Sequence, residues 1–245
     1  MAPDDSGTAA SPQCHLADRG NPFDAPQIAA RYESWHAGPG LAAAKEEKRL
    51  LRLLMRLLPP IQTVLDVGCG TGRSTRWFTG QDLVATGIDP SDAMLAEAER
   101  RGNEQFVKGD AERLPFAANE YDLVSFIISL EFVSDPERAI REAVRVARQG
   151  VLLGVQNRHS RLAARRRASG DPIWKRARFF TVSELKRLLR QAMAPEHCSL
   201  WWRTTLWPKP ISGSLPLPWG GFIGMIAQTP NEVDLPRVPD ANMNS

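Results

Sequence analysis

The chain has 245 residues, which is enough for one α/β domain with a sizeable hydrophobic core. Its composition, 42% hydrophobic and 24% charged, is that of an ordinary soluble protein. The net charge of +3 is too small to indicate nucleic-acid binding by itself. No apolar run reaches the roughly 18 residues that a membrane span needs.

Three cysteines, Cys14, Cys69 and Cys198, lie far apart in the sequence. An odd number at such spacing predicts neither a disulfide framework nor a metal cluster, so no metal is expected. The N-terminus is acidic and polar and has no signal-peptide pattern. A reducing compartment, the cytoplasm, is therefore expected.

The first 60 residues divide into a tail and helical segments. Residues 1–20 are rich in Ala, Ser, Pro and Asp and predict a disordered tail. Residues 41–58 predict an amphipathic helix that Pro59 and Pro60 end. The apolar stripe of that helix is predicted to consist of Leu50, Leu53, Leu54 and Leu57.

A short apolar strand then runs into three alternate glycines, Gly68, Gly70 and Gly72. Glycine presents no Cβ, so such a turn lets backbone N–H groups press against a ligand, and the helix that opens at Arg73 faces the same ligand. The dinucleotide pattern G-x-G-x-x-G fails because its sixth position is Arg73, and no Lys follows as in a phosphate loop. Asp66 would repel a pyrophosphate but suits a cationic amine or sulfonium.

The run V-L-D-V-G-C-G-T-G resembles motif I of the class I S-adenosylmethionine-dependent methyltransferases, in particular their type 11 domain group. This resemblance implies a three-layer α/β/α sandwich with a Rossmann-like, seven-stranded, mostly parallel sheet whose last strand is antiparallel. The alternation of predicted strands and helices supports the same α/β class independently. The implied cofactor is S-adenosylmethionine, with S-adenosylhomocysteine as product.

Residues 83–89 predict a second strand that ends in Asp89. Asp89 lies about twenty residues past the glycines, at what we expect to be an exposed strand end, where a carboxylate accepts both ribose hydroxyls. An N-cap for the helix at 92–101 is the alternative role. Met94, one turn into that helix, is predicted either to cover one face of the adenine or to lie in the core.

Residues 105–116 are similar to the family's G-D-A-x-x-L-P-F signature. By that resemblance Asp110 bonds the adenine amino group and the backbone of Ala111 contacts the ring. The A-x-x-Y-x-x-W pattern in residues 21–40 is similar to the family's N-terminal lid over the cofactor. Tyr32 is therefore a candidate pocket residue, with core packing as the equal alternative.

The fourth predicted strand begins at Tyr121 and places Ile127 near the cofactor, because ligands of parallel sheets lie beyond the carboxyl ends of strands. Glu131 follows where family members place substrate-facing residues. Glu131 and His159 are the two candidates for a catalytic base. The base stays unidentified, because an acceptor with a low pKa or an amine needs none.

Residues 158–180 predict a basic insertion, with eight Lys or Arg residues against the single acid Asp171 in its first 21 positions. Such a run is typical of a solvated helix face. The alternative is a patch for an anionic acceptor, RNA or a membrane surface, and the lack of interleaved aromatic residues disfavours RNA.

Thr181 and Glu184 then predict a capping box at the start of the next helix. Residues 198–206 and 221–228 predict the closing strands, and residues 229–245 a second tail. Residues 21–228 are thus expected to form a single methyltransferase domain, with residues 21–60 as its helical lid.

The predicted activity is methyl transfer from S-adenosylmethionine to a small-molecule acceptor, with anionic molecules the first to screen. One alternative is an RNA methyltransferase that uses the basic segment. The other is a cofactor-binding partner protein without catalysis. The sequence identifies neither the acceptor nor an oligomeric state.

Overall fold

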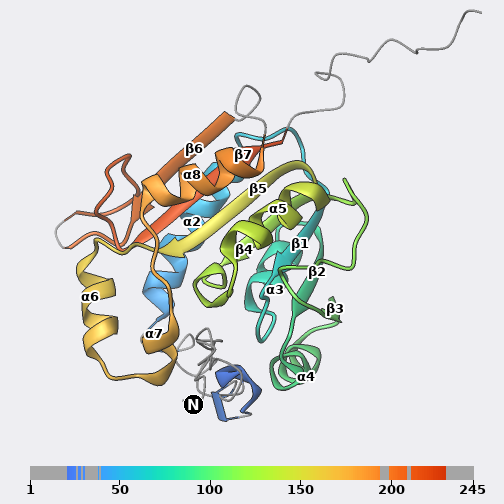
Figure 1. Ribbon diagram of the computed structural model, residues 1–245, viewed down its shortest axis with the longest axis horizontal. Helices are drawn as coiled ribbons and strands as arrows, with labels where there is room; N and C mark the ends of the chain where they lie inside the picture. Colours follow the sequence, from blue (N-terminus) through green and yellow to red (C-terminus); the bar gives the residue numbers. More distant parts are fainter. Residues whose placement is uncertain are drawn as a thin grey trace, which may run out of the picture.

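The computed structural model describes residues 21–25, 27–28, 30, 38, 40–193, 199–208 and 211–229 (Figure 1). Its helices are η1 (Pro22–Asp24), α2 (Leu41–Met55), α3 (Arg73–Thr79), α4 (Asp92–Arg101), η2 (Leu130–Phe132), α5 (Pro136–Val146), α6 (Arg161–Ala168), α7 (Pro172–Arg176) and α8 (Val182–Ala192). Its strands are β1 (Thr63–Val67), β2 (Val84–Asp89), β3 (Gln105–Lys108), β4 (Tyr121–Ile127), β5 (Ala147–Gln156), β6 (Ser199–Thr205) and β7 (Phe222–Gln228).

All seven strands form one sheet in the order β3-β2-β1-β4-β5-β7-β6. The first five are mutually parallel, and β7 is antiparallel to both β5 and β6. This confirms the predicted fold class. The strand order reverses between β1 and β4, so the ends of these two strands border the crevice in which open α/β sheets bind ligands.

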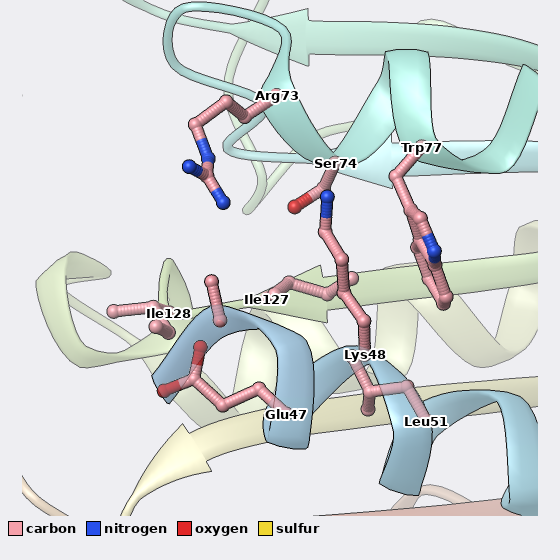
Figure 2. Close-up of a pocket in the computed structure, with 9 residues that line it drawn as sticks. Glu47, Lys48, Leu51, Arg73, Ser74, Trp77, Ile127 and Ile128 are labelled. Atoms are coloured by element: carbon pink, nitrogen blue, oxygen red, sulfur yellow. The ribbon is translucent and has the colours of Figure 1, made fainter. Parts of the chain in front are cut away.

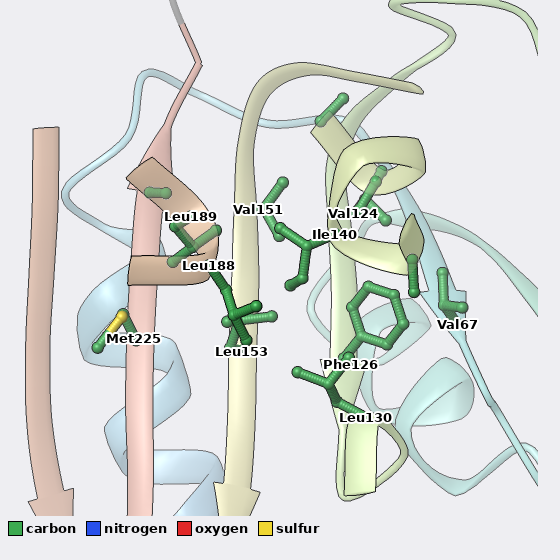
Figure 3. Packing of buried hydrophobic residues seen from close by; sticks show 14 of the residues in the cluster. Val67, Val124, Phe126, Leu130, Ile140, Val151, Leu153, Leu188, Leu189 and Met225 are labelled. Atoms are coloured by element: carbon green, nitrogen blue, oxygen red, sulfur yellow. The ribbon is translucent and has the colours of Figure 1, made fainter. Parts of the chain in front are cut away.

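Hydrophobic side chains pack on both faces of the sheet. On one face α5 and α8 cover β4, β5 and β7, with Phe126, Ile140 and Leu189 fully buried between the layers (Figure 3). On the other face α2 packs across β5, β6 and β7, while α3 packs on β1 and β2. Phe78 of α3 and Leu51 of α2 are fully buried there.

Polar side chains begin several helices, as the sequence predicts. The hydroxyl of Thr181 accepts from Glu184 N and the Glu184 carboxylate accepts from Thr181 N, which confirms the predicted capping box. Ser91, not Asp89, is the N-cap of α4, since its hydroxyl accepts from Met94 N. These caps satisfy backbone donors that a helix start leaves without a partner.

The predicted apolar stripe of α2 is partly wrong. Leu50, Leu51 and Leu54 are buried, whereas Leu53 is 42% and Leu57 44% exposed. Leu57 lies past the last helical residue, Met55, so helical spacing does not apply to it. Successive residues of a helix are rotated by about 100° around its axis. The buried side of α2 extends from Leu50 in the direction of Leu51, and Leu53 lies on the other side of Leu50, toward solvent.

Two predicted segments can be located in the structure. In chain order, the basic insertion forms α6 and α7, which follow β5 and precede α8. Thr229, expected in the tail, instead extends the pairing of β7 with β5 by donating from its backbone N–H to Gln149 O. Both the residues 1–20 tail and the residues 230–245 tail lie outside the described residues.

The contrast between two neighbouring leucines of α2 yields a stability prediction. Leu54→Ala should lower the free energy of unfolding by about 2–5 kcal/mol, because Leu54 is 2% exposed and its removal leaves a cavity. Leu53→Ala, the matched control, should change it by less than about 1 kcal/mol. Urea denaturation measures both, and equal losses would contradict the described face of α2.

Candidate functional site

The glycine turn after β1 is held in a shape that only glycine accepts easily. Gly68, Gly70 and Gly72 have φ of +69°, +55° and +78°. A Cβ on Gly68 would lie 2.4 Å from the Cβ of Ser129, beyond the end of β4. Around the position of a Gly70 Cβ, by contrast, no described atom lies within 4 Å. The turn therefore packs closely against the segment that follows β4 on one side, and on the other side no described atom is near it.

Asp89 connects this turn to the start of α4. Its Oδ2 accepts from Gly70 N at 2.9 Å, and its Oδ1 accepts from Ser91 N at 2.9 Å. The sequence-based expectation of an exposed strand end is wrong, because Asp89 is only 7% exposed. The glycine turn folds over the end of β2 and covers it. Burial raises the pKa of Asp89, although the two N–H donors oppose this.

Asp66 lies beneath the same turn, where it is 1% exposed. Its Oδ2 accepts from the Thr75 hydroxyl at 2.8 Å, and its Oδ1 accepts from the Ser125 hydroxyl at 3.2 Å. Burial raises the pKa of Asp66 to about 6, while these two hydrogen bonds lower it. The described partners of Asp66 are thus neutral hydroxyls, which hold its orientation without compensating its charge.

The remaining predicted cofactor residues occupy different environments. Asp110 is exposed, and its Oδ1 accepts from Glu112 N, while Ala111 is half-buried in the same loop. Met94 is only 3% exposed within α4. Ile127, the last residue of β4, lines a pocket. Tyr32 lies outside the described residues.

That pocket lies between α2, α3 and the end of β4 and contains about 350 Å³ of space, part of it open to solvent (Figure 2). Glu47 and Lys48 extend into it from α2, opposite Arg73 and Ser74 of α3. Its lining residues are Ala44, Glu47, Lys48, Leu51, Arg73, Ser74, Trp77, Ile127 and Ile128.

Glu47 is a buried residue that the sequence motifs do not mark, although the sequence carries a signal for it. Glu47 lies three, four and seven residues before the buried leucines of α2, so helical spacing alone puts it on the buried face. Burial raises the pKa of Glu47 to about 7, although the charges of Arg166, Arg73 and Lys48 lower it. Burial lowers the pKa of Lys48 to about 8, and Arg73 and Arg76 add to this effect.

Glu131, a candidate base, is 1% exposed on η2. Its Oε1 accepts from Gln156 N at 2.6 Å, and its backbone oxygen accepts from Arg178 N. Its Oε2 is buried and accepts no hydrogen bond from any described residue. Burial raises the pKa of Glu131 to about 7, against the opposing effects of the backbone donors and Arg166, and Glu47 raises it further.

The other candidate base, His159, is exposed in the turn before α6 and is not among the pocket residues. Arg161, Arg165 and Arg167 of α6 are also exposed, as the solvated-face interpretation predicts. Arg166 differs, because it is half-buried and its guanidinium lies 4.0 Å from the ring centre of Trp174. Trp174 contacts Phe132, the neighbour of Glu131, with ring centres 6.1 Å apart.

Within the described ranges, no group of three or more His, Cys, Asp or Glu side chains is placed to hold a metal ion. Of the helices described, none is both long and apolar enough to cross a membrane.

The fold and the glycine turn together define a class of cofactor-binding α/β proteins, and comparisons identify the family. Residues 65–155 match the model of a methyltransferase domain. An uncharacterized protein of Mycobacterium tuberculosis is 34% identical over 167 residues, which are 66% of this chain and 56% of that protein. The malonyl-[acyl-carrier protein] O-methyltransferase of Enterobacter lignolyticus is 32% identical over 136 residues, 54% of this chain and 53% of that enzyme.

Among solved structures, a possible histamine N-methyltransferase of Thermotoga maritima superposes with a TM-score of 0.68. It is 26% identical, and the match covers 83% of this chain and 96% of that chain. The matched domain and these relatives support the class I S-adenosylmethionine-dependent methyltransferases as the family of this chain. It spans about half the length of the curated relatives it matches.

Because Glu131 is a buried acid, we expect the free energy of unfolding of the protein to depend on pH. Its pKa rises from 4.5 to about 7 on folding, so the folded protein holds this proton more tightly and loses stability as the pH rises between these values. In Glu131→Gln this loss disappears. From pH 5 to pH 8 the variant should therefore gain roughly 2–3 kcal/mol in free energy of unfolding relative to the parent.

Chemical denaturation at both pH values measures this difference. Glu142→Gln is the matched control, because the hydrogen bond from Arg145 holds the pKa of Glu142 below its ordinary value. Its stability contribution is present above its ordinary pKa of 4.5 and is lost only on further acidification, so between pH 5 and pH 8 this variant should keep a nearly constant difference in free energy of unfolding from the parent. Parallel pH profiles of Glu131→Gln and the parent would contradict the assignment.

Proposed function

We propose that this protein transfers a methyl group from S-adenosylmethionine to a small-molecule acceptor. The observation that carries the proposal is the glycine turn, whose open side adjoins the buried carboxylate of Asp89. When bound, the cofactor supplies an activated methyl group, which moves to a nucleophile as the carbon–sulfur bond breaks and its electron pair stays on sulfur. The protein has to bind the cofactor and the acceptor, orient them toward each other and exclude water.

Several residues fit the cofactor in this proposal. The backbone of Gly68, Gly70 and Gly72 approaches it closely, with room above Gly70. Each Asp89 oxygen accepts one N–H and keeps a further lone pair for a ribose hydroxyl. The loop of Asp110 and Ala111 would hold the adenine, and Ile127 would contact the cofactor from β4. Met94 and Tyr32 complete the proposed set.

Asp66 is proposed to act through its charge. It is buried under the turn with hydroxyl partners, so its negative charge favours the cationic end of the cofactor over a phosphate ligand. Its raised pKa would fall when such a cation binds, because an opposite charge stabilises the ionised form.

The lining of the pocket supports a small acceptor. Side chains of α2, α3 and the end of β4 leave a narrow space between them, which suits a small molecule better than a folded nucleic acid. The names of the relatives, a malonyl-carrier-protein O-methyltransferase and a possible histamine N-methyltransferase, do not agree on one acceptor. We also propose that residues 21–228 act as one domain. The cytoplasmic location stays a prediction.

Turnover tests the proposal. The protein is incubated with S-adenosylmethionine and either a macromolecule-free cell filtrate or total RNA, and S-adenosylhomocysteine is quantified. Release that depends on the filtrate supports the proposal. Release only with RNA, abolished when Arg161, Arg165 and Arg167 are replaced by Ala, would instead establish the RNA alternative. Cofactor binding without turnover in either mixture would favour a non-catalytic partner protein.

The proposed ribose contact yields a sharper prediction. Asp89→Asn should weaken S-adenosylhomocysteine binding by roughly 10- to 100-fold, because charge-assisted hydrogen bonds are worth about 1.5–3 kcal/mol. Asp92→Asn is the matched control. Asp92 lies three residues on, in the first turn of α4, and is exposed and paired with Lys108.

Calorimetric titration of both variants measures the effect. Asp92→Asn should bind like the parent protein. Equal affinities in all three proteins would show that Asp89 does not contact the cofactor. Its role would then be structural, through the hydrogen bonds from Gly70 N and Ser91 N.

A further inference from the structure

Glu131 has a carboxylate oxygen that the described protein leaves without a hydrogen bond. Its Oε1 is bonded to Gln156 N, but its buried Oε2 accepts nothing. The side-chain amide of Gln156, fully buried, likewise makes no hydrogen bond with its Oε1 or Nε2. Buried polar atoms in native proteins nearly always have partners, so two adjacent residues with unused atoms indicate a binding site.

The register of β5 against α2 places this site beside the pocket. A Cβ on Gly150 would lie 2.8 Å from Leu58, and one on Gly154 would lie 3.3 Å from Leu51. Gln156 lies two residues beyond Gly154, about 7 Å farther along β5. Glu47 lies one turn before Leu51, about 6 Å along α2 in the same direction. Gln156 and Glu47 therefore occupy the same end of these elements, next to Glu131.

The charges around this site are distributed unevenly. Three cations, Arg166, Arg73 and Lys48, lower the pKa of Glu47. The charge of Arg166 lowers the pKa of Glu131, and the charge of Glu47 raises it. Arg166 reaches this region from α6 and Glu47 from α2. Glu131 thus shares Arg166 with a second buried carboxylate, and its Oε2 accepts no hydrogen bond from any described residue.

We propose that Glu131 is a catalytic residue that binds the nucleophilic amino group of the methyl acceptor, so that the acceptor is a small amine. This inference rests on the proposed function. An ammonium group carries only donors, which match Glu131 Oε2 and the amide oxygen of Gln156. It also brings a positive charge to the two buried carboxylates, Glu131 and Glu47. A carboxylate or phosphate in the same place would be repelled by Glu131.

The same contact prepares the nucleophile. The ammonium N–H bond breaks, its proton goes to Glu131 Oε2, and its electron pair remains on nitrogen as the lone pair that methyl transfer requires. Glu131 becomes a neutral acid, the form that its burial favours. A pKa near 7 suits both states of this exchange at neutral pH.

Paired probes test the inference by calorimetry at pH 8, with and without saturating S-adenosylhomocysteine. The probes are butylamine and phenethylamine, each matched with the carboxylate of similar shape, pentanoate and 3-phenylpropionate. At least one amine should bind and its matched carboxylate should not. Glu131→Gln should weaken amine binding at least roughly tenfold and leave S-adenosylhomocysteine affinity unchanged. Binding should also weaken as the pH falls below 7 and Glu131 becomes protonated.

Asp122→Asn is the matched control, since Asp122 is a buried acid at the opposite end of β4 that accepts from Gln62 N and Thr63 N. It should leave amine binding unchanged. Three results would overturn the inference: carboxylates bind instead, amines bind equally to Glu131→Gln, or no amine binds to a protein that binds S-adenosylhomocysteine. If S-adenosylhomocysteine itself does not bind, the result would instead contradict the proposed function.

Discussion

The main physical constraint on this protein is the cost of burying carboxylates at the C-terminal ends of the parallel strands. Asp66 and Glu131 are each 1% exposed and Asp89 is 7% exposed, and burial raises the pKa of all three. Their hydrogen bonds come from hydroxyls and backbone N–H groups, which orient a charge but do not neutralise it. Ligands that bring positive charge, a sulfonium and an amine, would lower this cost.

The fold brings these acids to one edge. Asp66 and Asp89 end or nearly end the neighbouring strands β1 and β2, and Glu131 follows β4. The glycine turn closes over Asp89, while Gln156 at the end of β5 fixes Glu131. Cofactor and acceptor would then meet where the strand order reverses.

The sequence predicted the fold, which the structure confirms. Motif I and the strand-ending acid lie on contiguous segments, so local pattern was sufficient to single out Gly68, Gly70 and Asp89, whose role in cofactor binding stays a prediction. The burial of Asp89 was missed because it depends on a turn nineteen residues away. Glu47, Gln156 and Arg166 come from three separate elements, and only tertiary packing assembles them around Glu131. Helical spacing alone could have marked Glu47 as buried.

A crystal structure of the protein with bound S-adenosylhomocysteine tests the account most directly. The distance from the cofactor sulfur to Glu131 Oε2 is the decisive quantity. One methyl group and one acceptor nitrogen have to fit between these atoms, so we expect roughly 6–8 Å. Ribose hydroxyls bonded to Asp89 and a sulfur at that distance would support the account. A sulfur more than roughly 12 Å from Glu131, or an adenosyl group away from Asp89, would contradict it.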